Sequence, residues 1–187
     1  MKLIPLFRMI SNHFSAFSMT PSRFYSCTVG SLVLLLSAST SYADDTFSAA
    51  DKAFVGKVSQ GGMFEVELAK VAETKATTQD LREQAATEEH DHTLVGNKLK
   101  SIMEANGMEF PTALNSEFQA RLDKLSALSG AAFDAAYLHA MEQIHHIDGA
   151  AFKQESTGGS NADLKAFAAE THRIVLRHLG ELGATVN

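Results

Sequence analysis

Residues 48–75, SAADKAFVGKVSQGGMFEVELAKVAETK, hold the pattern that decides the fold. Ser48 is a good helix N-cap, and Asp51 follows three residues later in the first turn. Apolar and small side chains then recur every three or four residues, which is the spacing of one helix face; they are Phe54, Val58, Gly61, Leu68, Ala69 and Ala72. The stretch predicts a long helix whose stripe must pack against other helices. Gly61 and Gly62 in its middle permit a kink or the close approach of a neighbour.

The rest of the chain continues this pattern with few interruptions. Similar stripes predict helices from Thr77 or Thr78 to a stop at Gly107, from Ser116 to about Leu128, from about Ala131 to Glu155, and from a cap at Ser160 or Asn161 onward. The stripe of the fourth helix includes Phe133, Tyr137, Ile144, Ile147 and Ala151. No alternating strand pattern of useful length is present. The fold class is therefore all-α, a four-helix bundle with one additional short helix.

The first 43 residues differ from the rest and resemble a secretory signal. They contain Lys2, Arg8 and Arg23 but no acid, then the apolar run 29–38, and finally Ser-Tyr-Ala ending at Ala43. The apolar run is shorter than the roughly 20 residues that span a bilayer. We expect cleavage after Ala43, one domain over 44–187, no stable transmembrane span, and export to the periplasm or outer envelope of a bacterium. A retained N-terminal anchor is the alternative.

Removing this segment changes the composition. The single Cys, Cys27, is lost, and 13 Lys and Arg remain against 22 Asp and Glu, a formal charge of -9. A chain without Cys forms no internal disulfide, no thiolate zinc site and no thiol nucleophile. An acidic balance argues against a nucleic-acid partner, which would need a basic face.

Several ionisable residues interrupt the apolar stripes. Glu65 lies 11 residues after Phe54, so at 100° per residue it is about 20° away, in mid-stripe. The same arithmetic places acids and histidines of the other long helices on inward faces; they are Glu88, His92, His145 and His178. Glu89 lies at the edge of its stripe, while Asp134 shares the side of His145 and Tyr137 is central. Each long helix thus carries an inward acid or His.

Buried charges must meet one another, a metal or water. Carboxylate oxygen and imidazole nitrogen together suit iron, manganese, zinc or copper. Ferritin-like dimetal sites use Glu-x-x-His on two helices, and two such strings occur, Glu89 to His92 and Glu142 to His145. Glu142 faces away from its stripe, however, and no further inward Glu completes the plan. A metal site, an internally neutralised hydrogen-bonded cluster with Tyr137, and a water-lined cavity all remain open.

Several ordered strings resemble the bacterial domain-of-unknown-function 4142 family over about residues 45–182. They are GGMFEVELAK at 61–70, Asp91-His92 with Leu99, Leu125, Leu128-Ser129-Gly130, Phe133-Asp134, Tyr137, Met141, His145, Phe152 and His178-Leu179. The resemblance implies a ferritin-like helical bundle in a bacterial envelope and no established activity. Asp91, Asp134 and Tyr137 all stand in these strings, and we expect them to support the inward cluster.

Three functions are compatible with these features. The first is a non-enzymatic binding module, associated with the envelope or with envelope stress, whose Glu and His cluster can hold a metal. The second is a ferritin-like, metal-dependent redox enzyme with ligands among Glu65, Glu88 or Glu89, His92, His145 and His178. The third is a purely structural bundle that binds a protein partner. A homo-oligomer is compatible with all three.

Overall fold

The computed structural model describes residues 47–183, which form five α-helices and no strand. The helices are α1 (Ala49–Lys75), α2 (Gln79–Ala105), α3 (Ser116–Ser126), α4 (Gly130–Gly158) and α5 (Ala162–Glu181). The expected all-α fold with four long helices and one short one is confirmed. The predicted signal segment, the predicted cleavage site after Ala43 and Cys27 lie outside the described residues.

Side-chain caps start the helices close to the residues that the sequence predicts. Ser48 forms a capping box: the Asp51 N–H donates to Ser48 Oγ at 3.1 Å, and the Ser48 N–H donates to Asp51 Oδ2 at 2.8 Å. Thr78 and Asn161 cap α2 and α5. Gly107 follows α2 with φ 71°, the left-handed conformation that glycine adopts without strain. Because these signals are local, the helix limits follow from sequence to within a few residues.

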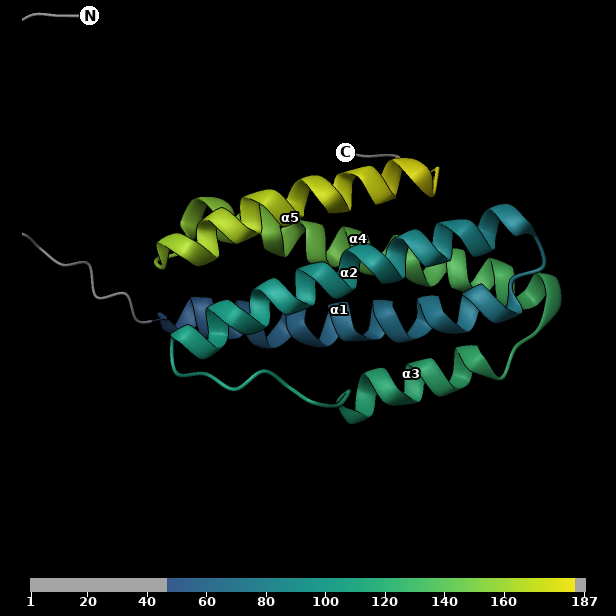
Figure 1. Ribbon diagram of the computed structural model, residues 1–187, viewed down its shortest axis with the longest axis horizontal. Helices are drawn as coiled ribbons and strands as arrows, with labels where there is room; N and C mark the ends of the chain where they lie inside the picture. Colours follow the sequence, from purple (N-terminus) through teal and green to yellow (C-terminus); the bar gives the residue numbers. More distant parts are fainter. Residues whose placement is uncertain (1–46, 184–187) are drawn as a thin grey trace, which may run out of the picture. The chain divides into compact units, whose positions relative to one another are not determined.

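The four long helices form a ring in which neighbours are antiparallel (Figure 1). α1 packs against α2 and α4, and α5 packs against the same two helices. The connection from α2 back to the start of α4 runs along the bundle and contains α3, which packs on α1 and α4. One long crossover of this kind is the connectivity of ferritin-like bundles. Among the described residues, no helix has both the length and the apolar character to cross a membrane.

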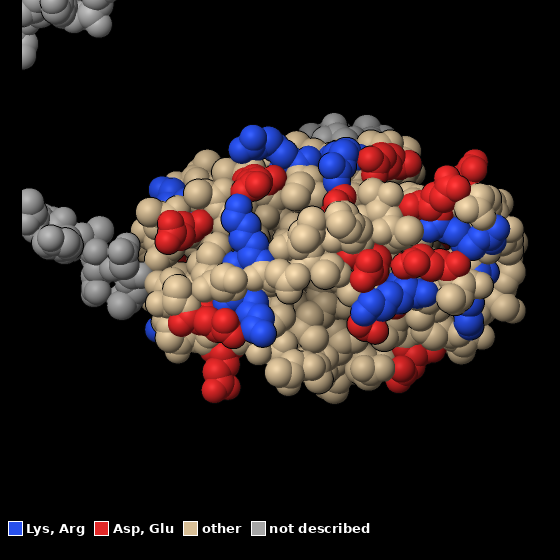
Figure 2. Space-filling model, in the orientation of Figure 1, with Lys and Arg blue, Asp and Glu red and all other residues tan. Residues whose placement is uncertain are grey.

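Two apolar clusters fill the bundle, and a layer of polar side chains lies between them along α1, α2 and α4. On α2, for example, Ala85 belongs to one cluster, Leu99 and Met103 to the other, and Glu88 and His92 fall between. Most other charged side chains lie on the surface, and Figure 2 shows acidic and basic side chains interspersed on one face. Hydrophobic burial thus stabilises both ends of the bundle while its middle layer holds ionisable groups.

A pair of carboxyl groups joins the start of α1 to the connection between α4 and α5. Asp51, the capping residue of α1, also accepts a hydrogen bond at 3.0 Å from the Ser160 N–H and another from the Ser160 hydroxyl. Glu155 of α4 is buried against Asp51, and burial together with the contact to this carboxylate raises the pKa of Glu155 to about 7. Lys165 of α5 acts weakly in the opposite direction. Glu155 is therefore largely protonated in the folded protein below neutral pH.

This pair makes stability depend on pH. Because Glu155 ionises at about pH 7 when folded and near 4.5 in its unperturbed state, the folded state holds the extra proton between these values. Its contribution to the free energy of unfolding is full below about pH 4.5 and is lost as the pH rises through 7. In Glu155→Gln the amide N–H replaces the O–H donor of the protonated acid, and the side chain does not titrate. We expect this variant to be more stable than the wild type at pH 8 and not at pH 5. Urea unfolding of both proteins from pH 5 to 8 measures the difference, and parallel pH profiles would contradict the assignment.

Candidate metal centre

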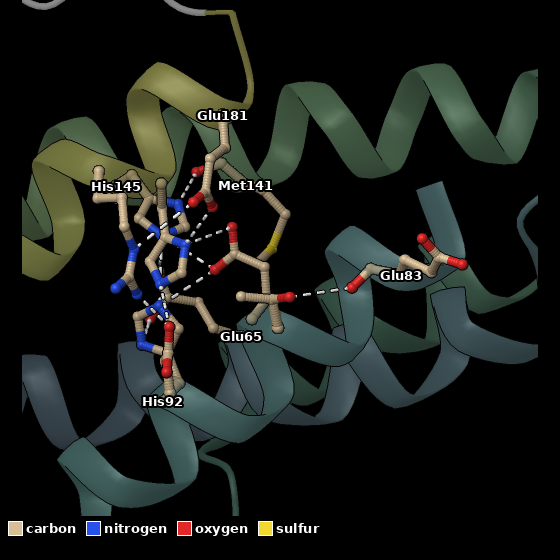
Figure 3. Close-up of polar contacts among 11 residues, drawn as sticks. Glu65, Glu83, His92, Met141, His145 and Glu181 are labelled. Atoms are coloured by element: carbon tan, nitrogen blue, oxygen red, sulfur yellow. Dashed lines mark hydrogen bonds and ion pairs between the residues drawn. The ribbon is translucent and has the colours of Figure 1, made fainter. Parts of the chain in front are cut away.

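The polar layer is a cluster of two carboxylates and three imidazoles. Glu65 comes from α1, Glu88 and His92 from α2, His145 from α4 and His178 from α5, and each is at most 3% exposed. Figure 3 shows Glu65, His92 and His145 pointing toward one another from their separate helices. The structure thus brings together the five residues that helical periodicity predicted to face inward.

Three atoms at the centre of this cluster form an equilateral triangle. His92 Nε2, His145 Nε2 and Glu88 Oε2 lie 3.3 Å from one another along all three edges. Ligands on a tetrahedral zinc ion with bonds of about 2.05 Å are roughly 3.3–3.4 Å apart, so the triangle has the size of one face of such a tetrahedron. Two overlapping sets also have ligand atoms within 4.8 Å: Glu65, His92 and His145, and Glu88, His92 and His178. We favour the triangle because its atoms are closer and equally spaced.

The two imidazoles of the triangle are held from behind through their other ring nitrogen. His145 Nδ1 lies 2.7 Å from the Met141 carbonyl oxygen, and His92 Nδ1 lies 3.2 Å from Glu65 Oε2. Both acceptors favour a proton on Nδ1, so Nε2 is the nitrogen of each ring that faces the centre. A carbonyl or carboxylate behind the ring is the arrangement that orients metal-binding histidines in proteins.

His178, the third imidazole of the cluster, also contacts two acids outside it, Asp91 and Glu181. Its Nδ1 lies 3.4 Å from Glu88 Oε1 and 3.2 Å from Glu181 Oε2, and its Nε2 lies 3.3 Å from Asp91 Oδ2. Asp91 in turn pairs with Arg177. His178 therefore contacts the second oxygen of Glu88, opposite the triangle, and helps to fix the direction of that carboxylate.

Burial and neighbouring charges shift the ionisation of these groups. Burial opposes ionisation of Glu88, but the His145 and His92 imidazoles outweigh it and hold its pKa at about 2. Burial disfavours the imidazolium of His145, yet the Glu65 and Glu88 carboxylates raise its pKa to about 9, and they raise that of His92 as well. Burial and the other imidazoles lower the pKa of His178. The two carboxylates thus favour positive charge at the centre of the cluster.

Several polar atoms of the cluster lack a hydrogen bond. Within the described part of the chain, no donor is aligned with either Glu88 oxygen or with Glu65 Oε1, although imidazole nitrogens lie close. The Tyr137 hydroxyl also has no hydrogen-bond partner among the described residues. Burial, together with the negative charges of Glu88 and Glu65, raises the pKa of this phenol. Buried carboxylate oxygens without hydrogen bonds are costly. The donor set thus fits a bound cation better than an internally satisfied network.

The family assignment rests on most of the chain. The family model described as Domain of unknown function (DUF4142) matches residues 36–184. The chain belongs to the DUF4142 family. No curated protein and no solved structure matches the chain in the corresponding searches. The resemblance seen in the sequence is confirmed, and the family carries no assigned activity.

The structure of this DUF4142 chain separates some of the other expected residues from the cluster and places others beside it. Glu89 is partly exposed and accepts a hydrogen bond from Thr93, so the carboxylate that meets His92 is Glu88, one helical turn before it, and not Glu89 of the Glu-x-x-His string. Glu142 is also partly exposed. Asp134 accepts hydrogen bonds from Thr77 at the turn between α1 and α2. Asp91 contacts the cluster through His178, and Tyr137 is fully buried beside it.

Sequence reasoning missed Asp148. It placed Ile147 on the buried stripe of α4, which is wrong: Ile147 is 46% exposed and Asp148 is 4% exposed. Asp148 fits inside because Gly61 of α1 faces it; a Cβ at Gly61 would lie 2.1 Å from Asp148 Oδ2. Burial and the nearby Glu65 carboxylate raise the pKa of Asp148 to about 7. The signal in the sequence was the glycine in the α1 stripe, which left room for a side chain of a neighbouring helix.

Neighbouring glycines of α1 offer a matched test of this contact. Gly62→Ala meets no atom within 4 Å and removes the cost of glycine in a helix, so we expect the free energy of unfolding to rise by about 0.5–1 kcal/mol. Gly61→Ala must displace Asp148, and we expect a net loss of about 1–3 kcal/mol. Denaturant unfolding of both variants at one pH measures the contrast. Equal effects of the two substitutions would show that Asp148 does not occupy this position.

Proposed function

We propose that this DUF4142 protein is a metal-binding module of the bacterial cell envelope, with one first-row transition-metal ion bound by His92 Nε2, His145 Nε2 and Glu88 Oε2. The observation that carries the proposal is the buried 3.3 Å triangle of these atoms, in which no described residue makes a hydrogen bond to either Glu88 oxygen. Glu65 and the Met141 carbonyl orient the two imidazoles. Asp91 and Glu181 contact the imidazole of His178 and keep it in place.

The chemistry of the donors narrows the metal. Two imidazole nitrogens and one carboxylate oxygen suit zinc, iron, manganese or copper, and three protein ligands leave a coordination position open. A metal with an open position supplies Lewis-acid or redox chemistry when bound. The binding role alone requires only the ligand set, and a redox role rests additionally on which metal occupies it.

Placement in the envelope is supported by the sequence. Residues 1–43 combine early basic residues, a short apolar run and a Ser-Tyr-Ala cleavage pattern. An exported protein that lacks cysteine after residue 43 cannot use disulfides or thiolates. Imidazole and carboxylate ligands fit such a chain because they do not depend on the redox state of the compartment.

Metal binding can be measured with cobalt as a spectroscopic substitute. We expect untagged protein to bind one equivalent of Co²⁺, with visible bands of a low-symmetry site, and to gain thermal stability on binding. His92→Ala and His145→Ala should each weaken the affinity by at least about 100-fold, since each removes a ligand. His146→Ala is the matched control, because His146 follows His145 on α4 and is exposed. Its affinity should equal that of the wild type.

A structural cluster would give a different result. The proposal fails if Zn²⁺, Fe²⁺, Mn²⁺, Cu²⁺ and Co²⁺ all bind below about a tenth of an equivalent without raising the melting temperature, or if His146→Ala weakens binding as much as His145→Ala.

Glu65→Gln tests whether Glu65 orients the imidazole of His92 or binds the metal itself. We expect a loss of roughly 10–100-fold in affinity, because Glu65 contacts the imidazole of His92.

A further inference from the structure

We propose that the protein also binds a small one-ring aromatic molecule, in an apolar pocket between α1 and α2 that has His92 in its wall. The pocket has a volume of 180 Å³. Its walls come from both helices, from Phe110 in the connection after α2 and from Phe152 of α4. The pocket itself is independent of the metal; that the ring is held beside a metal rests on the proposed function.

The walls determine the chemistry of the ligand. Val66, Val95 and Leu99 supply aliphatic surface, while Phe110 and Phe152 supply rings and Met63 a thioether. Aromatic and thioether groups interact favourably with a ring in the pocket. Charged lining residues such as Glu67 and Lys100 have exposed side chains and belong to the rim. An uncharged ring therefore fits these walls better than an ionic ligand.

The volume sets the size of the ligand. An engineered protein cavity of about 150 Å³ with apolar walls binds benzene. The pocket beside His92 is slightly larger, at 180 Å³, so it has room for a single ring with a small substituent. The buried Ser59 hydroxyl in the wall is already satisfied, since it donates to the Gly56 carbonyl at 3.3 Å. His92 is the other buried polar residue of the wall, and its two ring nitrogens already contact Glu65 and the triangle, so the pocket favours an uncharged ring.

Two glycines keep this space open. Gly62 of α1 and Gly96 of α2 both line the pocket, and a Cβ at either position would meet no atom within 4 Å. Glycine inside a helix costs about 1 kcal/mol relative to alanine, and neither glycine is required here by close packing of the helices. Because neither glycine has a side chain, the space beside these two positions of the wall stays open.

The test uses benzene as the probe and metal-free full-length protein. We expect saturable one-to-one binding with a Kd of about 1 mM or tighter, seen as NMR shifts of methyl groups that line the pocket, such as those of Val66 and Val95. Gly96→Leu and Gly62→Leu place a side chain in the pocket and should each weaken binding at least tenfold. Gly56→Leu, the same change at an exposed site of α1, should bind benzene as the wild type does.

Several results would overturn the proposal: shifts that grow linearly without saturation, equal benzene binding by Gly96→Leu, Gly62→Leu and Gly56→Leu, or tighter binding of n-hexane than of benzene. Circular dichroism checks that each variant folds. Because Gly96→Leu and Gly62→Leu both fill the pocket, one of them still tests the proposal if the other does not fold. A separate titration of phenol into cobalt-loaded protein tests proximity to the metal, through changes in the visible bands. If cobalt does not bind, the metal proposal fails while the benzene result stands by itself.

Discussion

The structure depends on the burial of two carboxylates and three imidazoles at one level of a helical bundle. Isolated charges at this depth would cost several kcal/mol each. The cluster tolerates them because opposite charges face each other: Glu65 and Glu88 lie against His92 and His145. The helices must keep these side chains in register, and two apolar clusters lie on either side of the polar layer. Removing one partner would leave the others uncompensated.

The connectivity of the bundle explains how the donor atoms meet. The long crossover through α3 makes α2 and α4 run in the same direction on opposite sides of the ring (Figure 1). The three atoms of the triangle come from these two helices, so they meet near the bundle axis. α1 and α5 lie between them and supply Glu65 and His178, which contact the triangle residues from the sides. The triangle residues and the side chains that contact them from the sides thus come from alternate helices.

The cluster and the apolar pocket are adjacent parts of one site, because His92 belongs to both. Its ring nitrogens contact Glu65 and the triangle, while the residue also forms part of the pocket wall. In the proposed function three protein ligands leave the metal an open position, and a molecule in the apolar pocket would lie beside one of those ligands, His92. A binding module and an enzyme share this architecture. They differ in whether the bound molecule reacts.

The sequence by itself determined the helices, their caps and the inward direction of Glu65, Glu88, His92, His145 and His178, because helical periodicity and capping are properties of residues close together in the chain. Only the tertiary structure decided which atoms meet. It selected Glu88 over Glu89, placed Asp134 at a turn, buried Asp148 in place of Ile147 against Gly61, and opened the pocket beside His92. These outcomes depend on the axial register and separation of packed helices, which periodicity within one helix does not specify.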